Sequence, residues 1–152
     1  MEPKLFLAGP YPGLGDVETI RLRVSGLIAV GVRLFVDLTE PGAASAYTFW
    51  LSDQAEHIRL PIPDFGVPSF TLMVHILDTI DRALAVQRPV YLHCLGGLGR
   101  TGMVVGCYWV RRGMAGAEAL QHLDKLRQGT SLAHHPSPET EAQRCLVLHW
   151  RE

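Results

Sequence analysis

The sequence predicts a single α/β domain, residues 1–152, in which helices cover both faces of a central, mostly parallel sheet of about four to five strands. Three observations indicate this fold. Short apolar runs of strand length alternate with longer amphipathic segments, and Gly and Pro separate them. No internal repeat, low-complexity tract or linker interrupts that order. With 152 residues, 47% of them hydrophobic, the chain has the size and composition of one domain with a substantial core.

Strand-like runs and amphipathic helices alternate through the first part of the chain. Asp16 is placed to cap a helix that Gly31 ends, and Ser69 is placed to cap a second one. In both segments the apolar side chains recur every three or four residues, which is typical of a helix packed on a core. Residues 40–57 are rich in small and polar side chains and predict a long loop that can hold a short helix. The strand-like runs are residues 5–8, 32–38 and 58–62.

The second part of the chain predicts one more strand and three helices. Val90–His93 is a compact apolar run that leads directly into a glycine-rich segment. A mostly apolar helix is expected over residues 101–112, followed by an amphipathic helix that ends at Gly129. A last helix is expected to start at Ser137, as the cap, with Pro138 at its first helical position.

Composition and charge exclude several classes of function. The formal net charge of -1 leaves no excess of Lys and Arg for nucleic acid or an anionic membrane. The apolar run at residues 5–8 is too short for a signal-peptide core or a membrane span, so we expect a soluble, cytoplasmic protein. Cys94, Cys107 and Cys145 are odd in number and lack zinc-ligand spacing. We therefore expect no disulfide framework, no metal site and no cofactor.

The segment from His93 to Thr101 carries the candidate chemistry. A predicted strand turns here into a predicted helix, through a turn with three glycines that starts with a cysteine and ends with an arginine. Glycines allow successive backbone N–H groups to point inward, and the helix N-terminus adds the positive end of its dipole. Arg100 can place two N–H donors on two oxygens of one phosphate. The residues expected to bind a tetrahedral oxyanion are Leu95, Gly96, Gly97, Leu98, Gly99 and Arg100.

Cys94 stands at the start of this turn, where the converging donors would stabilise a thiolate. A thiolate is the form of cysteine that attacks phosphorus. Taken alone, a buried cysteine is more often a small hydrophobe, but the residues around Cys94 favour a nucleophile. A P-loop ATPase is a poor alternative, because the Gly-Lys-Ser or Gly-Lys-Thr ending of that motif is absent.

His93, Cys94, Arg100 and Thr101 resemble the active-site signature of the cysteine-based protein tyrosine phosphatase superfamily. The resemblance implies a tyrosine phosphatase-like fold, with Cys94 as nucleophile and Arg100 as the phosphate-binding side chain. It also implies that the Thr101 hydroxyl donates to the departing thiolate and that His93 orders the loop through hydrogen bonds. From position alone, Thr101 is equally a first-turn helix residue and His93 a packed support.

A general acid must protonate the leaving oxygen from outside the loop. Asp64 is the candidate, because Pro and Gly flank it in the hinged turn of residues 62–68. This turn resembles the mobile acid loop of tyrosine phosphatases, with Ile62 where the family usually has Trp. The alternative is that Asp64 merely caps a turn. Asp37 and Glu40, at the end of a predicted strand, are reserve candidates.

Residues 137–143 resemble the segment of tyrosine phosphatases whose glutamines position the hydrolytic water. Glu139 replaces the first glutamine and only Gln143 agrees, so a plain capped helix is the favoured interpretation of this segment. Cys107 and Cys145 are expected in the core, with a reversible disulfide to Cys94 left open.

The small size, and the absence of a recognisable phosphotyrosine-clamping segment, resemble the compact dual-specificity branch of the superfamily. This implies a phosphorylated protein or peptide as substrate, with phosphotyrosine and also phosphoserine or phosphothreonine admitted. A phosphoinositide or inositol phosphate ranks second, because residues 95–98 carry no Lys for the extra phosphates. A catalytically silent phosphate-binding module and a thiol redox protein are the further alternatives; the latter lacks a Cys-x-x-Cys pair.

Overall fold

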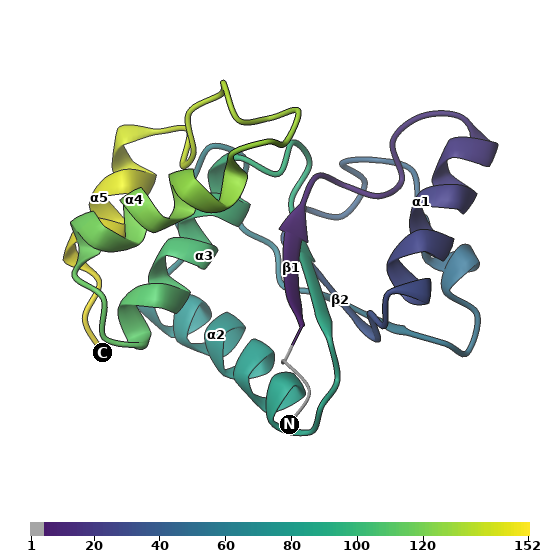
Figure 1. Cartoon of the computed structure of the whole chain (residues 1–152), viewed down its shortest axis with the longest axis horizontal. Helices are drawn as coiled ribbons and strands as arrows, with labels where there is room; N and C mark the ends of the chain where they lie inside the picture. Colours follow the sequence, from purple (N-terminus) through teal and green to yellow (C-terminus); the bar gives the residue numbers. More distant parts are fainter. Residues whose placement is uncertain (1–4) are drawn as a thin grey trace.

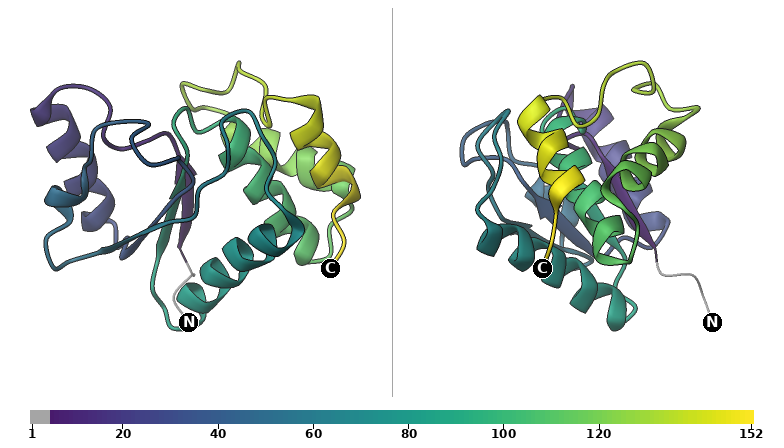
Figure 2. Two further views of the ribbon diagram at one scale, coloured as in Figure 1. Left: turned by 180° about the vertical axis from the view of Figure 1, so that it is seen from behind. Right: turned by 90° about the vertical axis from the view of Figure 1, so that its left-hand side faces the viewer.

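A computed structural model describes residues 5–152 and shows a parallel four-stranded sheet between two helical layers (Figures 1 and 2). In spatial order the strands are β1 (Phe6–Gly9), β4 (Val90–His93), β2 (Leu34–Asp37) and β3 (Glu56–Arg59). The helices are α1 (Val17–Ala29), α2 (Phe70–Ala85), α3 (Gly99–Arg111), α4 (Gly116–Arg127) and α5 (Glu141–His149), with a short 3₁₀ helix, η1 (Thr48–Leu51), in the long loop. The predicted fold class is confirmed.

The two faces of the sheet pack against different helices (Figure 1). On one face, Leu34 and Val36 of β2 belong to a core built with α2, α3, α4 and α5. On the other face, Phe35 and Tyr91 belong to a smaller core under α1 and η1. Both central strands are buried on each side, which explains their continuous apolar sequence. Among residues 5–152, no helix is both long and apolar enough to span a bilayer.

The strand register brings four chain segments to one edge of the sheet. His93, the last residue of β4, is paired with Gly9 of β1 on one side and with Asp37 of β2 on the other. Asp37 is in turn paired with Arg59 of β3. Because parallel strands end at the same edge, the loops after β1, β2, β3 and β4 all meet where β4 runs into the glycine-rich turn.

The structure corrects two expected element boundaries. The last helix begins at Glu141 rather than near Ser137, because the Thr140 side-chain oxygen accepts a hydrogen bond from the Gln143 N–H and the Gln143 Oε1 accepts one from the Thr140 N–H. The Ser137 hydroxyl instead donates to the Leu98 carbonyl at 2.6 Å. The third strand is residues 56–59 rather than 58–62. The caps predicted at Asp16 and Ser69 are both present.

Candidate active site

Residues 94–100, which we call the catalytic loop after the role predicted from the sequence, connect β4 to α3 at the carboxyl edge of the sheet. Cys94 is only 3% exposed, and the Gly97 N–H points at its Sγ from 3.3 Å. Gly97 has a φ of +76°, and a Cβ there would lie 2.6 Å from the backbone of Gly9 and Pro10. Glycine is therefore required both to turn this N–H inward and to let the loop pack on the end of β1. The sulfur lies beneath a donor that can stabilise negative charge.

Arg100 lies in the first turn of α3, and its side chain is 4% exposed. Its Nη1 donates to the Ile62 carbonyl at 3.1 Å and to the Leu38 carbonyl at 3.4 Å. Its Nη2 forms an ion pair with Asp64 Oδ1 at 3.1 Å. The guanidinium is thus held between the catalytic loop and the segment that carries Asp64. The Nη2 donor that binds the Asp64 carboxylate is also able to bind phosphate oxygens.

Asp64 lies on the acid loop, residues 62–68, with its side chain 57% exposed beside the buried Arg100. Ile62 anchors this loop and is fully buried, in the position where the related family usually has Trp. A tight turn holds Asp64, because the Gly66 N–H donates to the Pro63 carbonyl at 2.8 Å. The Asp64 carboxylate therefore faces the Arg100 guanidinium from a short turn closed by a hydrogen bond.

His93 supports the catalytic loop from below and is completely buried. Its Nδ1 faces two acceptors, the Cys94 carbonyl at 3.2 Å and the Asp37 carboxylate at 3.8 Å, so the proton of the neutral ring belongs on Nδ1. Nε2 then accepts a hydrogen bond from the Tyr47 hydroxyl at 2.6 Å. Burial lowers the pKa of His93 to about 4, which keeps the ring neutral near pH 7. The ring orients the peptide that follows Cys94.

Asp37 anchors this support from the end of β2 and is fully buried. It accepts hydrogen bonds from the Thr39 N–H at 2.8 Å and the Thr39 hydroxyl at 2.6 Å, and it lies 2.9 Å from His57 Nε2 and 3.2 Å from Arg59 Nη2. Burial alone would raise the pKa of Asp37, but the hydrogen bonds from His57 and Thr39 outweigh it and lower the pKa to about 2. A carboxylate that stays ionised and is occupied by its partners is not suited to be the reserve acid. Glu40 is exposed.

Thr101 and Gln143 also lie beside the catalytic loop. The Thr101 hydroxyl is buried and has no hydrogen-bond partner within the described part of the chain. Gln143 is fully buried, and its side-chain Nε2 donates to the Gly66 carbonyl of the acid loop at 3.1 Å. A Cβ on Gly99 would lie 2.9 Å from Gln143 Oε1, so the Gln143 amide also packs on the end of the catalytic loop. The structure therefore brings the residues singled out from sequence to one edge of the sheet.

The other two cysteines differ in their environments. Cys107 is buried in α3, and burial raises the pKa of its thiol to about 12. Cys145 is exposed on α5, which differs from the core position expected for it. All three cysteines are free thiols.

Sequence reasoning did not find Tyr47 or His57 as parts of the site. Tyr47 lies in the long loop predicted over residues 40–57, yet it is fully buried against His93. His57 lies in β3 and reaches Asp37. The available signal was a cluster of aromatic residues, Tyr47, Phe49 and Trp50, in this segment, but the partner of Tyr47 is 46 residues away in the chain.

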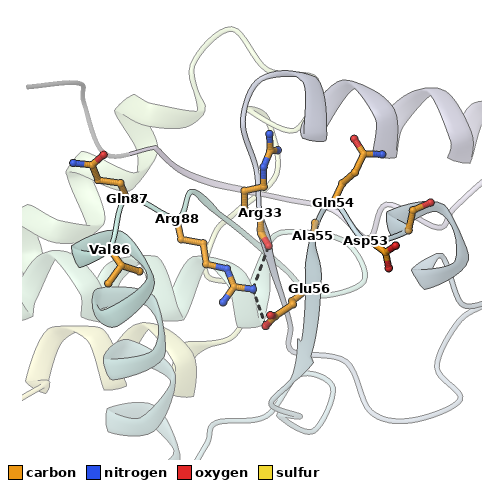
Figure 3. Close-up of a pocket in the computed structure, with 9 residues that line it drawn as sticks. Arg33, Asp53, Gln54, Ala55, Glu56, Val86, Gln87 and Arg88 are labelled. Carbon is orange, nitrogen blue, oxygen red and sulfur yellow. Dashed lines mark hydrogen bonds and ion pairs between the residues drawn. The ribbon is translucent and has the colours of Figure 1, made fainter.

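A separate surface hollow lies at the amino ends of β2 and β3 (Figure 3). Because the strands are parallel and Cys94 follows the carboxyl end of β4, the hollow is at the opposite edge of the sheet from Cys94. Its charged side chains are largely engaged with the protein itself. Arg88 Nη2 lies 2.7 Å from Glu56 Oε2, and Arg33 Nη1 donates to the Ile28 and Val32 carbonyls. No reactive group of the catalytic loop lines this hollow.

Known proteins that are similar to this chain include phosphatases. Residues 15–114 match a family model described as Tc-R-P, polymorphic toxin system, DSP-PTPase phosphatase. The chain is 28% identical over 154 residues to the 197R protein of Invertebrate iridescent virus 6, named for a tyrosine phosphatase, with 93% of this chain and 54% of that protein covered. It is 29% identical over 134 residues to phosphatidylglycerophosphate phosphatase PTPMT2 of Arabidopsis thaliana, with 86% and 55% covered. The chain thus spans about half the length of these curated relatives.

Two solved structures share the fold. The crystal structure of Tk-PTP in its active form superposes with a TM-score of 0.73 at 26% identity, covering 97% of this chain and 90% of that one. The structure of PTPMT1 in complex with PI(5)P superposes with a TM-score of 0.72 at 18% identity, covering 96% and 89%. At that lower identity, the second likeness bears on the fold alone.

Proposed function

The chain belongs to the DSP-PTPase phosphatase family of polymorphic toxin systems, and from this premise we propose that it hydrolyses phosphotyrosine, and also phosphoserine and phosphothreonine, on protein substrates. The observation that carries this proposal is that one loop holds Cys94 Sγ under an inward N–H and also holds a buried Arg100 that is paired with Asp64. We further propose that residues 1–152 act as one catalytic domain, in the cytoplasm, without a cofactor.

In the first step, the Cys94 thiolate attacks phosphorus in line, and the P–O bond to the substrate breaks as the P–S bond forms. The loop N–H groups and Arg100 hold the other phosphate oxygens, which replace the carboxylate on the arginine. Asp64, protonated at this stage, gives its proton to the departing oxygen. The products of this step are the dephosphorylated side chain and a phosphocysteine.

In the second step, water attacks the phosphocysteine while the ionised Asp64 accepts its proton. The S–P bond breaks, inorganic phosphate leaves, and the sulfur departs as a thiolate. The buried Thr101 hydroxyl, which has no partner among residues 5–152, supports the proposal that it donates to this departing thiolate. His93 supports the same step indirectly, by holding the Cys94 peptide in place.

A phosphoinositide or phospholipid monoester is the second candidate substrate. It is favoured by the name of the PTPMT2 relative and by the PI(5)P complex of the PTPMT1 neighbour. The four variable positions of the catalytic loop, Leu95 to Leu98, offer no cation beyond Arg100 for additional phosphates. This composition supports a singly phosphorylated side chain over a polyphosphorylated head group.

The test is hydrolysis of p-nitrophenyl phosphate with chelator present, followed by a panel of phosphopeptides and PI(5)P. We expect vanadate-sensitive activity that Cys94→Ser abolishes while phosphate binding remains, and higher kcat/KM for phosphopeptides than for PI(5)P. Asp64→Ala should slow poor leaving groups far more than p-nitrophenol. Activity that survives Cys94→Ser would reject the mechanism, and phosphate binding without any turnover would identify a silent binding module.

A further inference from the structure

Gln143 is the one buried side chain of α5 that reaches the acid loop. Its two amide atoms have different partners: Oε1 accepts from the Thr140 N–H at 3.2 Å, and Nε2 donates to the Gly66 carbonyl at 3.1 Å. The first contact belongs to the cap of α5. The second crosses 77 positions of sequence to the turn that carries Asp64. The cap explains the first contact and does not explain the second.

The turn that accepts this hydrogen bond is held together by its own hydrogen bonds, so a displacement of Gly66 also displaces Asp64. The Gly66 N–H is bound to the Pro63 carbonyl at 2.8 Å, and Phe65 is held at a φ of +58°, which non-glycine residues seldom adopt. The Phe65 N–H also donates to Asp64 Oδ1 at 3.0 Å. Asp64, Phe65 and Gly66 therefore form one braced unit rather than three independently moving residues.

The remaining contacts of this unit depend on Arg100, which must also bind phosphate. The Arg100 Nη2 contact to Asp64 is given up when phosphate oxygens occupy that donor. Asp64, Phe65 and Val67 are otherwise exposed on the outer side of the acid loop. The Gln143 hydrogen bond comes from a buried, helix-anchored side chain and does not compete with phosphate for its partner.

We propose that Gln143 is a positioning residue that latches the acid loop closed. Its hydrogen bond to Gly66 keeps Asp64 over the leaving oxygen after phosphate has replaced Asp64 on Arg100. This inference rests on the proposed phosphatase function and assigns Gln143 to the first chemical step. The resemblance to tyrosine phosphatases instead implies a role for this glutamine in the second step, through the hydrolytic water. The two roles have different kinetic consequences.

Two substitutions separate the latch from the helix cap. Gln143→Glu keeps an oxygen for the Thr140 N–H, as a capping box allows, but removes the donor to Gly66. Gln143→Met removes the donor without adding charge. Thr140→Ala is the matched control, because it removes the hydroxyl that caps the Gln143 N–H and leaves the side-chain contact to Gly66 in place.

The kinetic readout is the ratio of kcat/KM for p-nitrophenyl phosphate to kcat/KM for phenyl phosphate, since only the poorer leaving group needs the acid. We expect this ratio to rise roughly 10-fold in both Gln143 variants and to stay at the wild-type value in Thr140→Ala. In an Asp64→Ala background, the Gln143 substitutions should leave the ratio unchanged. An unchanged ratio in the single variants, or a burst of p-nitrophenol with a lower kcat and an unaltered kcat/KM, would overturn the latch.

A second readout does not require turnover and so separates this inference from the proposed function. Amide hydrogen exchange of residues 62–68 reports opening of the acid loop directly. We expect exchange there to accelerate roughly 10-fold in Gln143→Met and to match wild type in Thr140→Ala, even if the protein proves catalytically silent. Equal protection of this loop in wild type and Gln143→Met would refute the latch whatever the activity.

Discussion

Lowering the pH from 7 to 5 should destabilise the protein through a single buried side chain, His93. The folded protein holds this ring neutral because it is completely buried, and its pKa falls from 6.5 to about 4. The unfolded chain has no such burial and takes up a proton near pH 6.5. Between these two pKa values the unfolded state binds more protons than the folded state, so the free energy of unfolding decreases as the pH falls. The decrease stops below the folded pKa of about 4.

The size of the effect follows from the two pKa values. Linkage over this window predicts a loss of about 2 kcal/mol in the free energy of unfolding between pH 7 and pH 5. Asp37 acts at lower pH than His93. Its folded pKa of about 2 lies below its ordinary value of 3.8, so its stabilising contribution is lost only as the pH falls below about 3.8. The titratable and charged groups that face His93, namely Asp37, His57 and Arg59, are the same in a variant that changes only the ring.

Urea unfolding monitored by tryptophan fluorescence at pH 7, 6 and 5 measures this loss. His93→Asn is the control, because an amide can still donate to the Cys94 carbonyl but does not titrate in this range. Wild type should lose about 2 kcal/mol more than the variant between pH 7 and pH 5. Equal losses in the two proteins would show that the ring is not held neutral, and the proton placement argued above for Nδ1 would fail with it.

Three further substitutions test the backbone strain and side-chain packing in the site and in the neighbouring core. Gly97→Ala should lower kcat/KM for p-nitrophenyl phosphate by roughly 10²-fold, since the added Cβ would lie 2.6 Å from the backbone of Gly9 and Pro10. Gly129→Ala is the control and should keep the activity, because Gly129 has a similar φ of +81° but no atom near the added Cβ. Tyr47→Phe should cost about 1–3 kcal/mol in urea unfolding, because the buried imidazole loses its hydrogen-bond donor. Gly106→Ala should cost about 1–3 kcal/mol, since its Cβ would lie 2.7 Å from Val147, and Val147→Ala in the same chain should recover part of it.

The features that sequence predicted well are those encoded by neighbouring residues. The apolar run of β4, the glycines that follow it and the helix after them are contiguous, so local conformational preferences place Cys94 and Arg100 in one loop. The acid turn is similar, since Pro and Gly around Asp64 specify a turn whatever surrounds it. The α/β order also follows from local periodicity, and the four parallel strands agree with it.

Only the tertiary structure decided which distant segments support that loop. Tyr47 reaches His93 across 46 positions, and Gln143 reaches Gly66 across 77. Neither contact can be read from local pattern, because each depends on how the sheet order and helix packing close long stretches of chain onto one edge. The start of α5 was mispredicted for the same reason: Ser137 is a good helix cap by type, but packing against α3 gives its hydroxyl the Leu98 carbonyl instead. Local chemistry therefore determined the reactive groups, and long-range packing determined what holds them in position.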